Sequence, residues 1–394
     1  MRVELGQEAT GPLAGIRVLD LSSIVSGPLC AQILGDLGAD VVKVEPPRGD
    51  TARYLGNEGP PGLAGIFAQC NRNKRSVVLD LKQASGRAAF LALAARADVV
   101  VENFRAGVAD RLGIGYEVSS ARNPGLVWVA ISGFGPDGPY AEQPAYDMIV
   151  QGMSGFATML GDTDAPRLVG NLVADKTSGM TACYAVTAAL FARERGDGRG
   201  QKIEVPMLDA FSSFVHCDAF APHTYGLREV EPGLAGVYRA WKTADGHVAM
   251  LVVEDHHFEG LCRALEREDL LEDERYASIG SRIAHVEELF VVFEQELAKW
   301  PTAELVARAH REGTPLGPIH DVEGFLRDPQ TVHNHTVFEL QDPEAGTMRL
   351  FRSPPRFGAT PSNVRRTPPR LGADTEAVLR EAGLGEAEIA KLRG

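Results

Sequence analysis

The stretch GIRVLDLSSIVSGPLCAQILGDLGADVVKVE, residues 15–45, decides the fold. It opens with a β-branched run that ends in polar turn residues. Residues 28–39 then carry apolar side chains at helical spacing, and DVVKVE (40–45) returns to strand before a Pro-Pro pair ends it. A strand, a helix and a second strand at this spacing indicate a βαβ unit, whose two strands lie parallel in one sheet.

The same alternation continues beyond this unit. RSVVLDL (75–81), DVVVEN (98–103) and LVWVAISG (126–133) are predicted strands, and the Ala- and Leu-rich residues 83–96 are a predicted helix. Unbroken apolar strands are typical of parallel sheets that helices cover on both faces. We therefore predict an α/β fold around a mostly parallel sheet, with ligands at the carboxyl ends of its strands.

The second half of the sequence is less regular. Residues 176–194 form a predicted Ala-rich helix, KIEVPM (202–207) a strand, and the Pro- and Gly-rich residues 222–240 a linker. A hairpin with its turn at Asp245-Gly246, helices to about residue 313 and the Gly/Pro loop GTPLGPI (313–319) follow. The proline-rich residues 352–375 precede a short C-terminal helix and are expected to wrap another domain or subunit as an extended arm.

Composition narrows the class of protein. A chain of 394 residues predicts two domains, and a net charge of −13 argues against nonspecific binding to nucleic acid or anionic membranes. Five scattered cysteines without a CxxC pair indicate a reduced, intracellular chain without a zinc site. The N-terminus lacks a signal-peptide pattern, and no apolar run is long enough to cross a bilayer. We expect a cytoplasmic protein with soluble substrates.

Two motifs suggest chemistry that their context does not support. GFGPDG (133–138) matches GxGxxG, but its prolines favour a loop, whereas a dinucleotide site needs a helix to begin inside the motif. A nicotinamide-dependent dehydrogenase is therefore the weakest hypothesis. His256 and His257 are adjacent and have no third ligand at useful spacing, so we predict no metal site. No GxSxG elbow is present.

Asp175 is the candidate nucleophile, and it stands immediately before the predicted Ala-rich helix. Its simplest interpretation is an N-cap that accepts hydrogen bonds from the first helical amides. The two roles are compatible, because the helix macrodipole favours an ionised carboxylate. An ionised carboxylate can attack a thioester, and the exposed amides can stabilise an oxyanion.

Basic residues collect near the ends of predicted strands in this acidic chain. Arg72, Lys74 and Arg75 precede one strand, and Arg105 and Arg111 follow another. Such residues usually form solvated faces. Here they offer charge-assisted donors for the phosphate groups of an adenosine nucleotide.

These segments, in this order, resemble the class III CoA-transferases (CaiB/BaiF family), and the resemblance covers nearly the whole chain. The segments that carry it include LAGIRVLDLSS, GPLCAQILGDLGADVVKVEPPRGD, NRNKRSVVLDLK, ADVVVENFRAGVADRLGIGYE, ISGFGPDGPY, GDGRGQKIEVPMLDA, GTPLGPIHDVEGFLRDPQ and PPRLGADTEAVL. The resemblance implies a large Rossmann-like domain (1–222, completed by 335–394), a smaller α+β domain (223–334) and an interlaced homodimer.

The resemblance implies an acyl-CoA:carboxylate CoA-transferase whose nucleophile falls on Asp175. By resemblance, Asp175 forms a mixed anhydride with the acyl group and then an aspartyl-CoA thioester, from which coenzyme A passes to a second carboxylic acid. Coenzyme A and acyl-CoA are substrates in this scheme, and no permanent cofactor or metal is needed.

The resemblance also implies a set of coenzyme A contacts. They lie in the loop after the first strand, the LDLK segment, the NFR turn with a later arginine, and the ISGF loop. In this sequence they are Val25, Ser26, Leu79, Asp80, Leu81, Lys82, Asn103, Phe104, Arg105, Arg111, Ile131, Ser132, Gly133 and Phe134.

Three positions depart from the transferase pattern. Formyl-CoA transferases have glutamine where this chain has Val25, which argues against oxalate or formate as a substrate. Their glycine-rich flap is missing from EPGLAGVYRAW (231–241). A transferase arginine maps onto Pro46, for which Arg48 or Arg53 is close enough to substitute.

Two alternatives remain open at this point. The racemase branch of the family pairs its aspartate with a histidine, but this chain has Tyr146 there, at the predicted acyl site. A tyrosine with its usual pKa near ~10 is a poor base at neutral pH, so we favour transfer over racemisation. A non-catalytic CoA-binding protein is the second alternative, although it would not need a carboxylate at Asp175.

Overall fold

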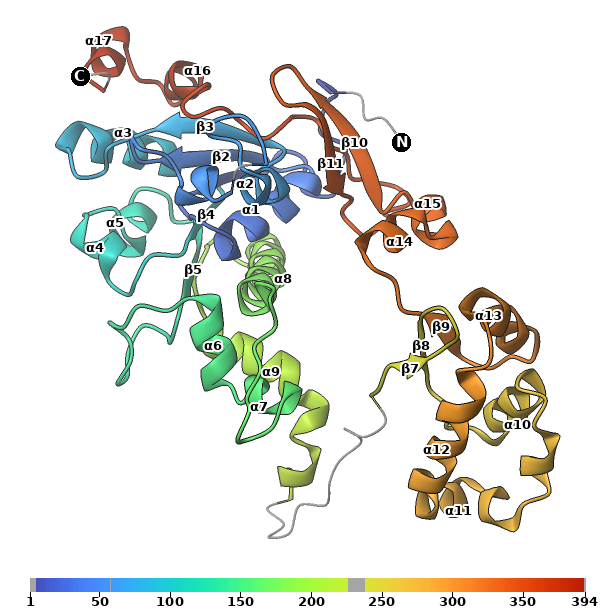
Figure 1. The fold of residues 1–394 in the computed structure, drawn as a ribbon. Helices are drawn as coiled ribbons and strands as arrows, with labels where there is room; N and C mark the ends of the chain where they lie inside the picture. Colours follow the sequence, from blue (N-terminus) through green and yellow to red (C-terminus); the bar gives the residue numbers. More distant parts are fainter. Residues whose placement is uncertain (1–4, 57, 226–237, 393–394) are drawn as a thin grey trace. The chain divides into compact units, whose positions relative to one another are not determined.

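The computed structural model describes residues 5–56, 58–225 and 238–392. The chain divides into two compact units, shown in Figure 1. The first unit comprises Met1–Asp218 together with Asn334–Gly394, and the second comprises Ala219–His333. We describe each unit by itself.

A six-stranded, entirely parallel sheet forms the centre of the first unit, in the order β3-β2-β1-β4-β5-β6. The α/β fold predicted from residues 15–45 is thus confirmed. The order is that of doubly wound, Rossmann-like sheets, and it reverses between β1 and β4, where such sheets bind ligands. The strands are β1 (Arg17–Asp20), β2 (Asp40–Glu45), β3 (Lys74–Val78), β4 (Val99–Glu102), β5 (Val127–Ser132) and β6 (Lys202–Pro206).

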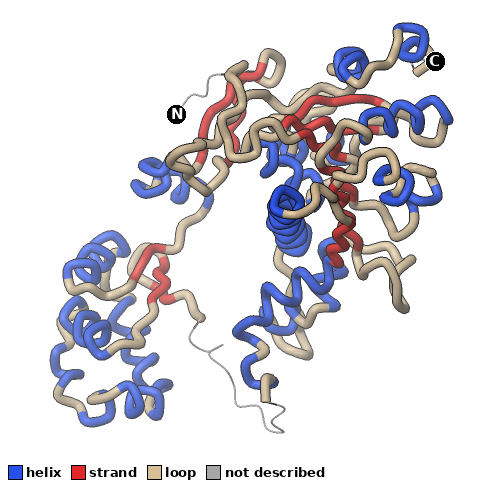
Figure 2. Tube along the Cα trace, turned by 180° about the vertical axis from the view of Figure 1, so that it is seen from behind, coloured by secondary structure: helices blue, strands red, loops and turns tan. Residues whose placement is uncertain are grey.

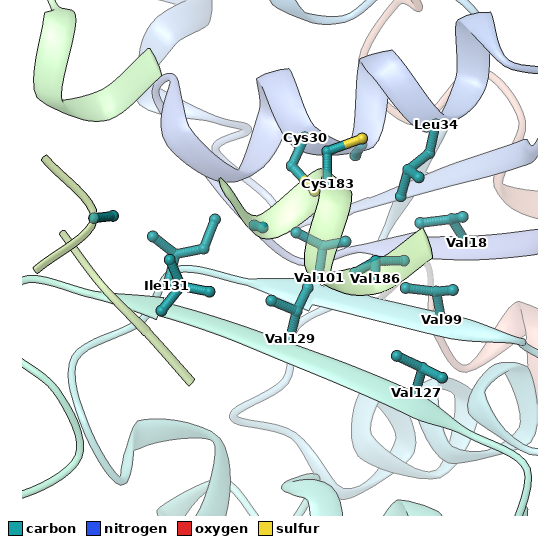
Figure 3. Close-up of a cluster of buried hydrophobic side chains, with 14 of the residues drawn as sticks. Val18, Cys30, Leu34, Val99, Val101, Val127, Val129, Ile131, Cys183 and Val186 are labelled. Carbon is teal, nitrogen blue, oxygen red and sulfur yellow. The ribbon is translucent and has the colours of Figure 1, made fainter. Parts of the chain in front are cut away.

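Side chains alternate between the two faces of the sheet, and each face has its own hydrophobic cluster. On one face, α1 (Ser26–Asp36) and α8 (Val173–Arg195) cover the sheet. Figure 3 shows this cluster, with strand valines such as Val101 and Val129 facing Cys30 of α1 and Val186 of α8. Because one face of the sheet packs against α8, the long helix that holds Asp175 is anchored along its length.

The opposite face packs against α3 (Ala84–Ala94) and the C-terminal α16 (Thr375–Glu381). Trp128 and Phe90 are the largest side chains buried there. The prediction of helices at 28–39, 83–96 and 176–194 is therefore confirmed, although α1 and α8 begin two or three residues earlier than expected.

Several elements of the first unit were not predicted. Most are helices of one or two turns, which leave little periodicity in the sequence, but the 13-residue α9 was missed too. A C-terminal hairpin was missed as well. These elements are η1 (Thr51–Tyr54), α2 (Gly65–Cys70), α4 (Val108–Arg111), α5 (Tyr116–Ser120), α6 (Asp147–Met153), α7 (Phe156–Leu160), α9 (Met207–Ala219), β10 (Val337–Asp342), β11 (Gly346–Phe351) and α17 (Glu386–Ala390).

The proline-rich arm, residues 352–375, lies against the first unit of its own chain. The guanidinium group of Arg365 donates to the carbonyl oxygen of Gly35 (3.1 Å), in the last turn of α1, and to that of Ala39 (3.0 Å), just after the helix. Further along, the carboxylate of Asp374 accepts from the backbone N–H of Ser76 at 2.9 Å. The arm therefore supplies hydrogen-bond partners to α1 and to the edge strand β3.

The second unit holds a small antiparallel sheet of β7 (Trp241–Lys242), β8 (His247–Met250) and β9 (Leu316–Pro318). Figure 2 shows its strands beside the surrounding helices. The predicted hairpin at Asp245-Gly246 is confirmed, whereas GTPLGPI is not entirely a loop, because β9 lies within it.

A hydrophobic core of its own, which includes Trp241, Phe258 and Phe293, holds the second unit together. Its remaining elements are η2 (Ala221–His223), α10 (Asp255–Ala264), η4 (Glu268–Leu271), η5 (Glu274–Tyr276), α11 (Ile279–Ala284), α12 (Val286–Leu297), α13 (Thr302–Arg311), α14 (Val322–Arg327) and α15 (Pro329–Asn334). Most of the predicted linker, residues 226–237, lies outside the described residues. Among the residues described, no helix combines the length and the apolar character that a bilayer span requires.

Candidate active site

Asp175 lies in the first turn of α8, but it does not cap the helix. The helix begins at Val173, with Leu172 at the N-cap position and no side-chain bond from it. The prediction that Asp175 is the N-cap is therefore wrong. The cap comes from a distant residue instead, because the carboxylate of Asp147 accepts from the backbone N–H of Asp175 at 3.0 Å.

Asp147 is the first residue of α6, and Gln151 holds it in place one turn later. The side-chain amide of Gln151 donates to the carboxylate of Asp147 and to the carbonyl oxygen of Asn171 (3.0 Å), and its oxygen accepts from Val169 N–H (3.0 Å). Both Asp147 and Gln151 are almost fully buried. The start of α8 and the loop before it are thus fixed by α6 rather than by local capping.

Ser26, the first residue of α1, approaches Asp175 from the other side. Its side-chain hydroxyl group lies close enough to the carboxyl group of Asp175 to lower the pKa of that group, against the larger effect of burial. The same hydroxyl oxygen accepts from the side-chain amide of Asn103 at 3.1 Å. Ser26 follows β1 and Asn103 follows β4, so the two residues meet where the strand order reverses.

The loop between β1 and α1 has a strained backbone. Ile24 has φ 69°, in the left-handed region that a β-branched residue rarely adopts. The side chain of Asn103 holds the loop through bonds to Ser23 N–H (2.9 Å) and to the Ser23 carbonyl oxygen (2.8 Å), and Asp50 accepts from Ile24 N–H (3.0 Å). Such strain persists where the surroundings over-determine a conformation, as they do at functional sites.

A glycine allows α1 and α8 to meet at this point. A Cβ atom at Gly179, one turn after Asp175, would lie 2.4 Å from the carbonyl oxygen of Ser26. No real side chain fits that space. The close approach brings the start of α1 against the first turns of α8 and places Ser26 beside Asp175.

The carboxyl group of Asp175 is only 9% exposed. Burial and the neighbouring negative charge of Asp147 raise the pKa of Asp175 to about 6, against the lowering effects of the Ser26 hydrogen bond and of Lys176. The sequence-based argument from the helix macrodipole expected an easily ionised group, and desolvation overrides it. At pH 7 the group is still mostly ionised, but as a poorly solvated and therefore more reactive base.

The residues that the resemblance assigned to coenzyme A lie at or after the carboxyl ends of four strands, with Val25 and Ser26 in the segment that follows β1. Asn103, Phe104 and Arg105 come after β4, Ile131–Phe134 end β5, and Leu79–Lys82 form the turn after β3 rather than part of the strand. The side chains of Val25, Leu79 and Ile131 are buried, so these residues can offer a ligand only their backbone groups. The exposed side chains of the set are Lys82, Arg105 and Arg111.

Three of the five basic residues expected to bind phosphate are engaged inside the protein. Lys74 is paired with Asp20 (2.8 Å), and Arg75 with Asp40 and Glu381 (2.7 Å each). Arg72 is likewise buried and paired, with the carboxylate of Asp36. The phosphate hypothesis is therefore wrong for Arg72, Lys74 and Arg75, which stabilise the fold, while Arg105 and Arg111 remain exposed.

Burial and ion pairing also distinguish Arg48 from Arg53, the two arginines proposed to replace the family arginine that is absent at Pro46. Arg53 is 1% exposed and forms a bidentate pair with Glu45, so it is not available. Arg48 is exposed. Tyr146, at the predicted acyl site, is 66% exposed and stands next to Asp147, at the N-cap of α6.

The remaining motifs behave as loops or surface residues. Residues 133–138 contain no helix start, which confirms that GFGPDG is a loop. His256 and His257 lie on α10, and within the described part of the chain no group of three or more His, Cys, Asp or Glu side chains is placed to hold a metal ion. Most of the segment compared with the glycine-rich flap lies outside the described residues.

Sequence reasoning missed the roles of Asp147 and Gly179 and assigned Ser26 to the ligand alone. Asp147 is 28 positions from Asp175, and no spacing rule connects the two across an irregular segment. A signal for Gly179 was present, since a glycine inside a long Ala-rich helix lowers helix stability and often marks a close contact.

Comparisons with known proteins agree on one family. The family model of CoA-transferase family III matches residues 13–375. The chain is 36% identical to succinate--glutarate CoA-transferase of Agrobacterium fabrum over 94% of this chain and 95% of that protein. It is 36% identical to succinyl-CoA:mesaconate CoA-transferase of Haloarcula marismortui, over 95% and 97% of the two chains. The crystal structure of a CaiB/BaiF family protein from Brucella suis has a TM-score of 0.83 at 33% identity, covering 95% of this chain and 100% of that one.

Proposed function

The chain belongs to CoA-transferase family III and is a CoA-transferase, and from this premise we propose that Asp175 is its nucleophile. The observation that carries this proposal is the environment of the carboxyl group. It is buried at the head of α8, with the hydroxyl group of Ser26 beside it and no ion pair to a lysine or an arginine among the described residues. A desolvated carboxylate with a pKa of about 6 is ionised and reactive at neutral pH.

The reaction proceeds by substitutions at carbonyl carbon. One oxygen of Asp175 attacks the thioester carbon of the donor, the C–S bond breaks, and coenzyme A leaves as the thiolate. The thiolate then attacks the γ-carbon of Asp175, and the donor acid leaves with the bridging oxygen. The acceptor carboxylate displaces the thiolate from the aspartyl thioester and forms a second mixed anhydride. The thiolate finally attacks the acceptor's carbonyl carbon, and Asp175 leaves as the carboxylate with the bridging oxygen. No step changes an oxidation state, so the scheme requires no redox cofactor. All reacting groups belong to Asp175 and the substrates, so it requires no permanent cofactor either.

Coenzyme A lies, in this proposal, along the turns that follow β3, β4 and β5. Arg105 and Arg111 are exposed after β4 and suit the phosphate groups, which bind best to charged, accessible donors. The backbone groups of Leu79 and Ile131 suit the neutral parts of the ligand, because their side chains are buried. These contacts predict that Arg105→Ala and Arg111→Ala raise the KM for acyl-CoA more than they lower kcat.

For the acids, we propose dicarboxylates as donor and acceptor. The support comes from relatives that share 36% identity over most of the chain and are named for succinate, glutarate and mesaconate. A panel of monocarboxylates and dicarboxylates, each offered against succinyl-CoA, tests this. Preference for monocarboxylates would contradict the substrate class and leave the nucleophile untouched.

An interlaced homodimer is the proposed assembly. It is supported by large apolar side chains that the first unit leaves exposed on several helices, since large exposed apolar surfaces mark sites of protein association. Light scattering after gel filtration should give twice the chain mass of 42.4 kDa, and a monomer would contradict it. The side chains are Met148, Ile149 and Met153 of α6, Met159 and Leu160 of α7, Met180, Tyr184 and Phe191 of α8 and Phe214 of α9.

Trapping the aspartyl intermediate tests the nucleophile directly. We expect hydroxylamine, added during turnover with succinyl-CoA, to convert Asp175 to a hydroxamate that peptide mass spectrometry locates. Unmodified Asp175 under turnover would refute the proposal. Acyl-CoA incubated in heavy water without an acceptor separates the racemase alternative, because only a racemase would exchange the α-proton for deuterium.

A further inference from the structure

We propose that Ser26, held by Asn103, binds one oxygen of the Asp175 carboxylate throughout turnover, so that only the other oxygen forms and breaks bonds. This inference rests on the proposed role of Asp175 as nucleophile. It assigns Ser26 and Asn103 a function within this site, as positioning residues, beyond contact with coenzyme A.

The hydrogen bonds around Ser26 leave its hydroxyl proton free to be donated. Asn103 Nδ2 donates to the hydroxyl oxygen of Ser26 at 3.1 Å, so the hydroxyl proton remains for the carboxylate of Asp175. Asn103 itself has little freedom, because its amide also bonds to both backbone groups of Ser23. Ser26 is 2% exposed. The hydroxyl oxygen is therefore held by the Asn103 amide in a buried position beside Asp175.

The backbone on both sides of this contact is equally constrained. Ile24 holds the loop before α1 in a left-handed conformation, and Gly179 lets α8 approach the Ser26 carbonyl oxygen closely. A contact that depends on strain and on a glycine is a costly arrangement for a structural hydrogen bond alone.

The chemistry gives the contact a purpose. When thiolate or acceptor attacks the γ-carbon of Asp175, the oxygen that does not bridge becomes an oxyanion. A preorganised donor already bound to that oxygen stabilises the transition state without reorganisation. The charged groups near this carboxylate are Asp147 on α6 and Lys176 on α8, and neither replaces a donor at the oxygen.

The fate of oxygen atoms distinguishes this role from a structural one. In each cycle the donor acid carries away the bridging oxygen of Asp175, and the acceptor replaces it with one of its own. With an acceptor dicarboxylate labelled fully with oxygen-18, repeated turnover should give an Asp175 peptide that gains one heavy atom and then stops. Ser26→Ala frees the carboxylate to rotate between cycles, so its peptide should gain a second heavy atom.

Controls separate the possible failures. Ser178→Ala removes another buried hydroxyl of α8, which bonds only to the Ala174 carbonyl oxygen in the described residues, and should keep the single label. Ser26→Thr retains the hydroxyl and should keep the single label and most of the rate. Ser26→Ala should lower kcat about 10² -fold with a smaller change in KM, as expected for one lost oxyanion donor.

Each labelling outcome is decisive. Two heavy atoms in the wild-type peptide would overturn the inference while supporting Asp175 as nucleophile. No heavy atom during active turnover would overturn the proposed function itself. Because the wild-type measurement needs no variant, the inference remains testable even if Ser26→Ala fails to fold.

Discussion

Two aspartates of the first unit, Asp20 and Asp175, are both buried, but their charged neighbours and their pKa values differ. Asp20, at the end of β1, is fully buried and lies 2.8 Å from the ammonium group of Lys74 and 3.6 Å from that of Lys43. Burial alone would raise its pKa, but Lys43, Lys74 and hydrogen bonds from Lys74 and Ser22 outweigh it and lower the pKa to about 2. Asp175 has a hydroxyl and a second carboxylate as neighbours, and burial together with the charge of Asp147 raises its pKa to about 6.

The difference shows what each carboxylate is for. A buried charge that is fully paired with cations is locked in its ionised form and is unreactive, so Asp20 serves the fold. A buried charge next to a like charge lowers the stability of the folded protein, and proteins tolerate that arrangement mainly where the group reacts. Asp147 supplies the like charge for Asp175, and it also caps the helix, so the same residue positions and activates the nucleophile.

The largest expected effect comes from removing the reactive carboxylate of this pair, Asp175. Asp175→Asn keeps the shape of the side chain and removes the nucleophile, so we expect kcat to fall by at least about 10⁴-fold. The same change should raise the free energy of unfolding at pH 7.5 by up to about 3 kcal/mol, because it removes a desolvated charge. Turnover assays and chemical denaturation measure the two effects, and a stability loss would contradict the comparison.

The pH dependence of that stability gain follows from the sign of the shift. The pKa of Asp175 is raised in the folded protein, so its destabilising effect is fully present above about pH 6 and absent below its unfolded value near ~4. The difference in unfolding free energy between Asp175→Asn and wild type should therefore shrink as the pH falls from about 6 to about 4. A difference that stays constant over this window would show that charge is not its cause.

Removing the paired aspartate should have the opposite effect on stability. Asp20→Asn leaves two buried lysine ammonium groups without their shared partner, and we expect the free energy of unfolding to fall by about 3–5 kcal/mol at pH 7. Asp40→Asn is the matched control, since Asp40 pairs with Arg17 and Arg75 but its side chain is 38% exposed. That change should cost under about 1 kcal/mol. Equal losses in the two variants would argue that burial of the pair does not matter.

Gly179 tests whether Asp175 depends on the packing of α8 against α1. Gly179→Ala would place a methyl group 2.4 Å from the Ser26 carbonyl oxygen, so the helices must separate. We expect a loss of about 1–3 kcal/mol in stability and a lower kcat. Gly280→Ala in α11 is the control, because its Cβ would meet only the Ser278 hydroxyl, at 4.0 Å, and it should be neutral or slightly stabilising. Unchanged activity in Gly179→Ala would argue against the Ser26 contact.

The sequence predicted the sheet and the long helices because their signals are local. Residues 15–45 contain a complete βαβ unit, and the Ala-rich run before residue 195 contains most of α8. The buried ion pairs had a local signal as well. Lys43 and Glu45 alternate within a strand predicted to be buried, and buried charges require partners. The sequence does not say which partners, because Asp20 and Arg53 reach them through the fold.

The candidate site was predictable only in part, for the same reason. The resemblance located Asp175, and its position near a helix start explains why a carboxylate is tolerated there. Its raised pKa depends on Asp147, which reaches α8 from another helix, and on burial that only the packed structure creates. Likewise, Arg72 and Arg75 looked like accessible cations until the partners Asp36 and Asp40 came into contact with them.

The smallest expected effect concerns the one cation that lowers the pKa of Asp175. Lys176 is exposed, and its charge acts on Asp175 without a direct bond, because its ammonium group hydrogen bonds to Asn171. Lys176→Gln should move the acid limb of the kcat/KM profile, expected near pH 6, upward by about 0.1–0.7 unit, the range for an exposed charge. Salt screens exposed charges, so the difference between variant and wild type should shrink at high ionic strength, whereas the raised pKa that burial and Asp147 produce should persist. A downward shift of the acid limb would mean that this limb does not report the ionisation of Asp175. The contrast between Asp175 and Asp20 would then carry no conclusion about function.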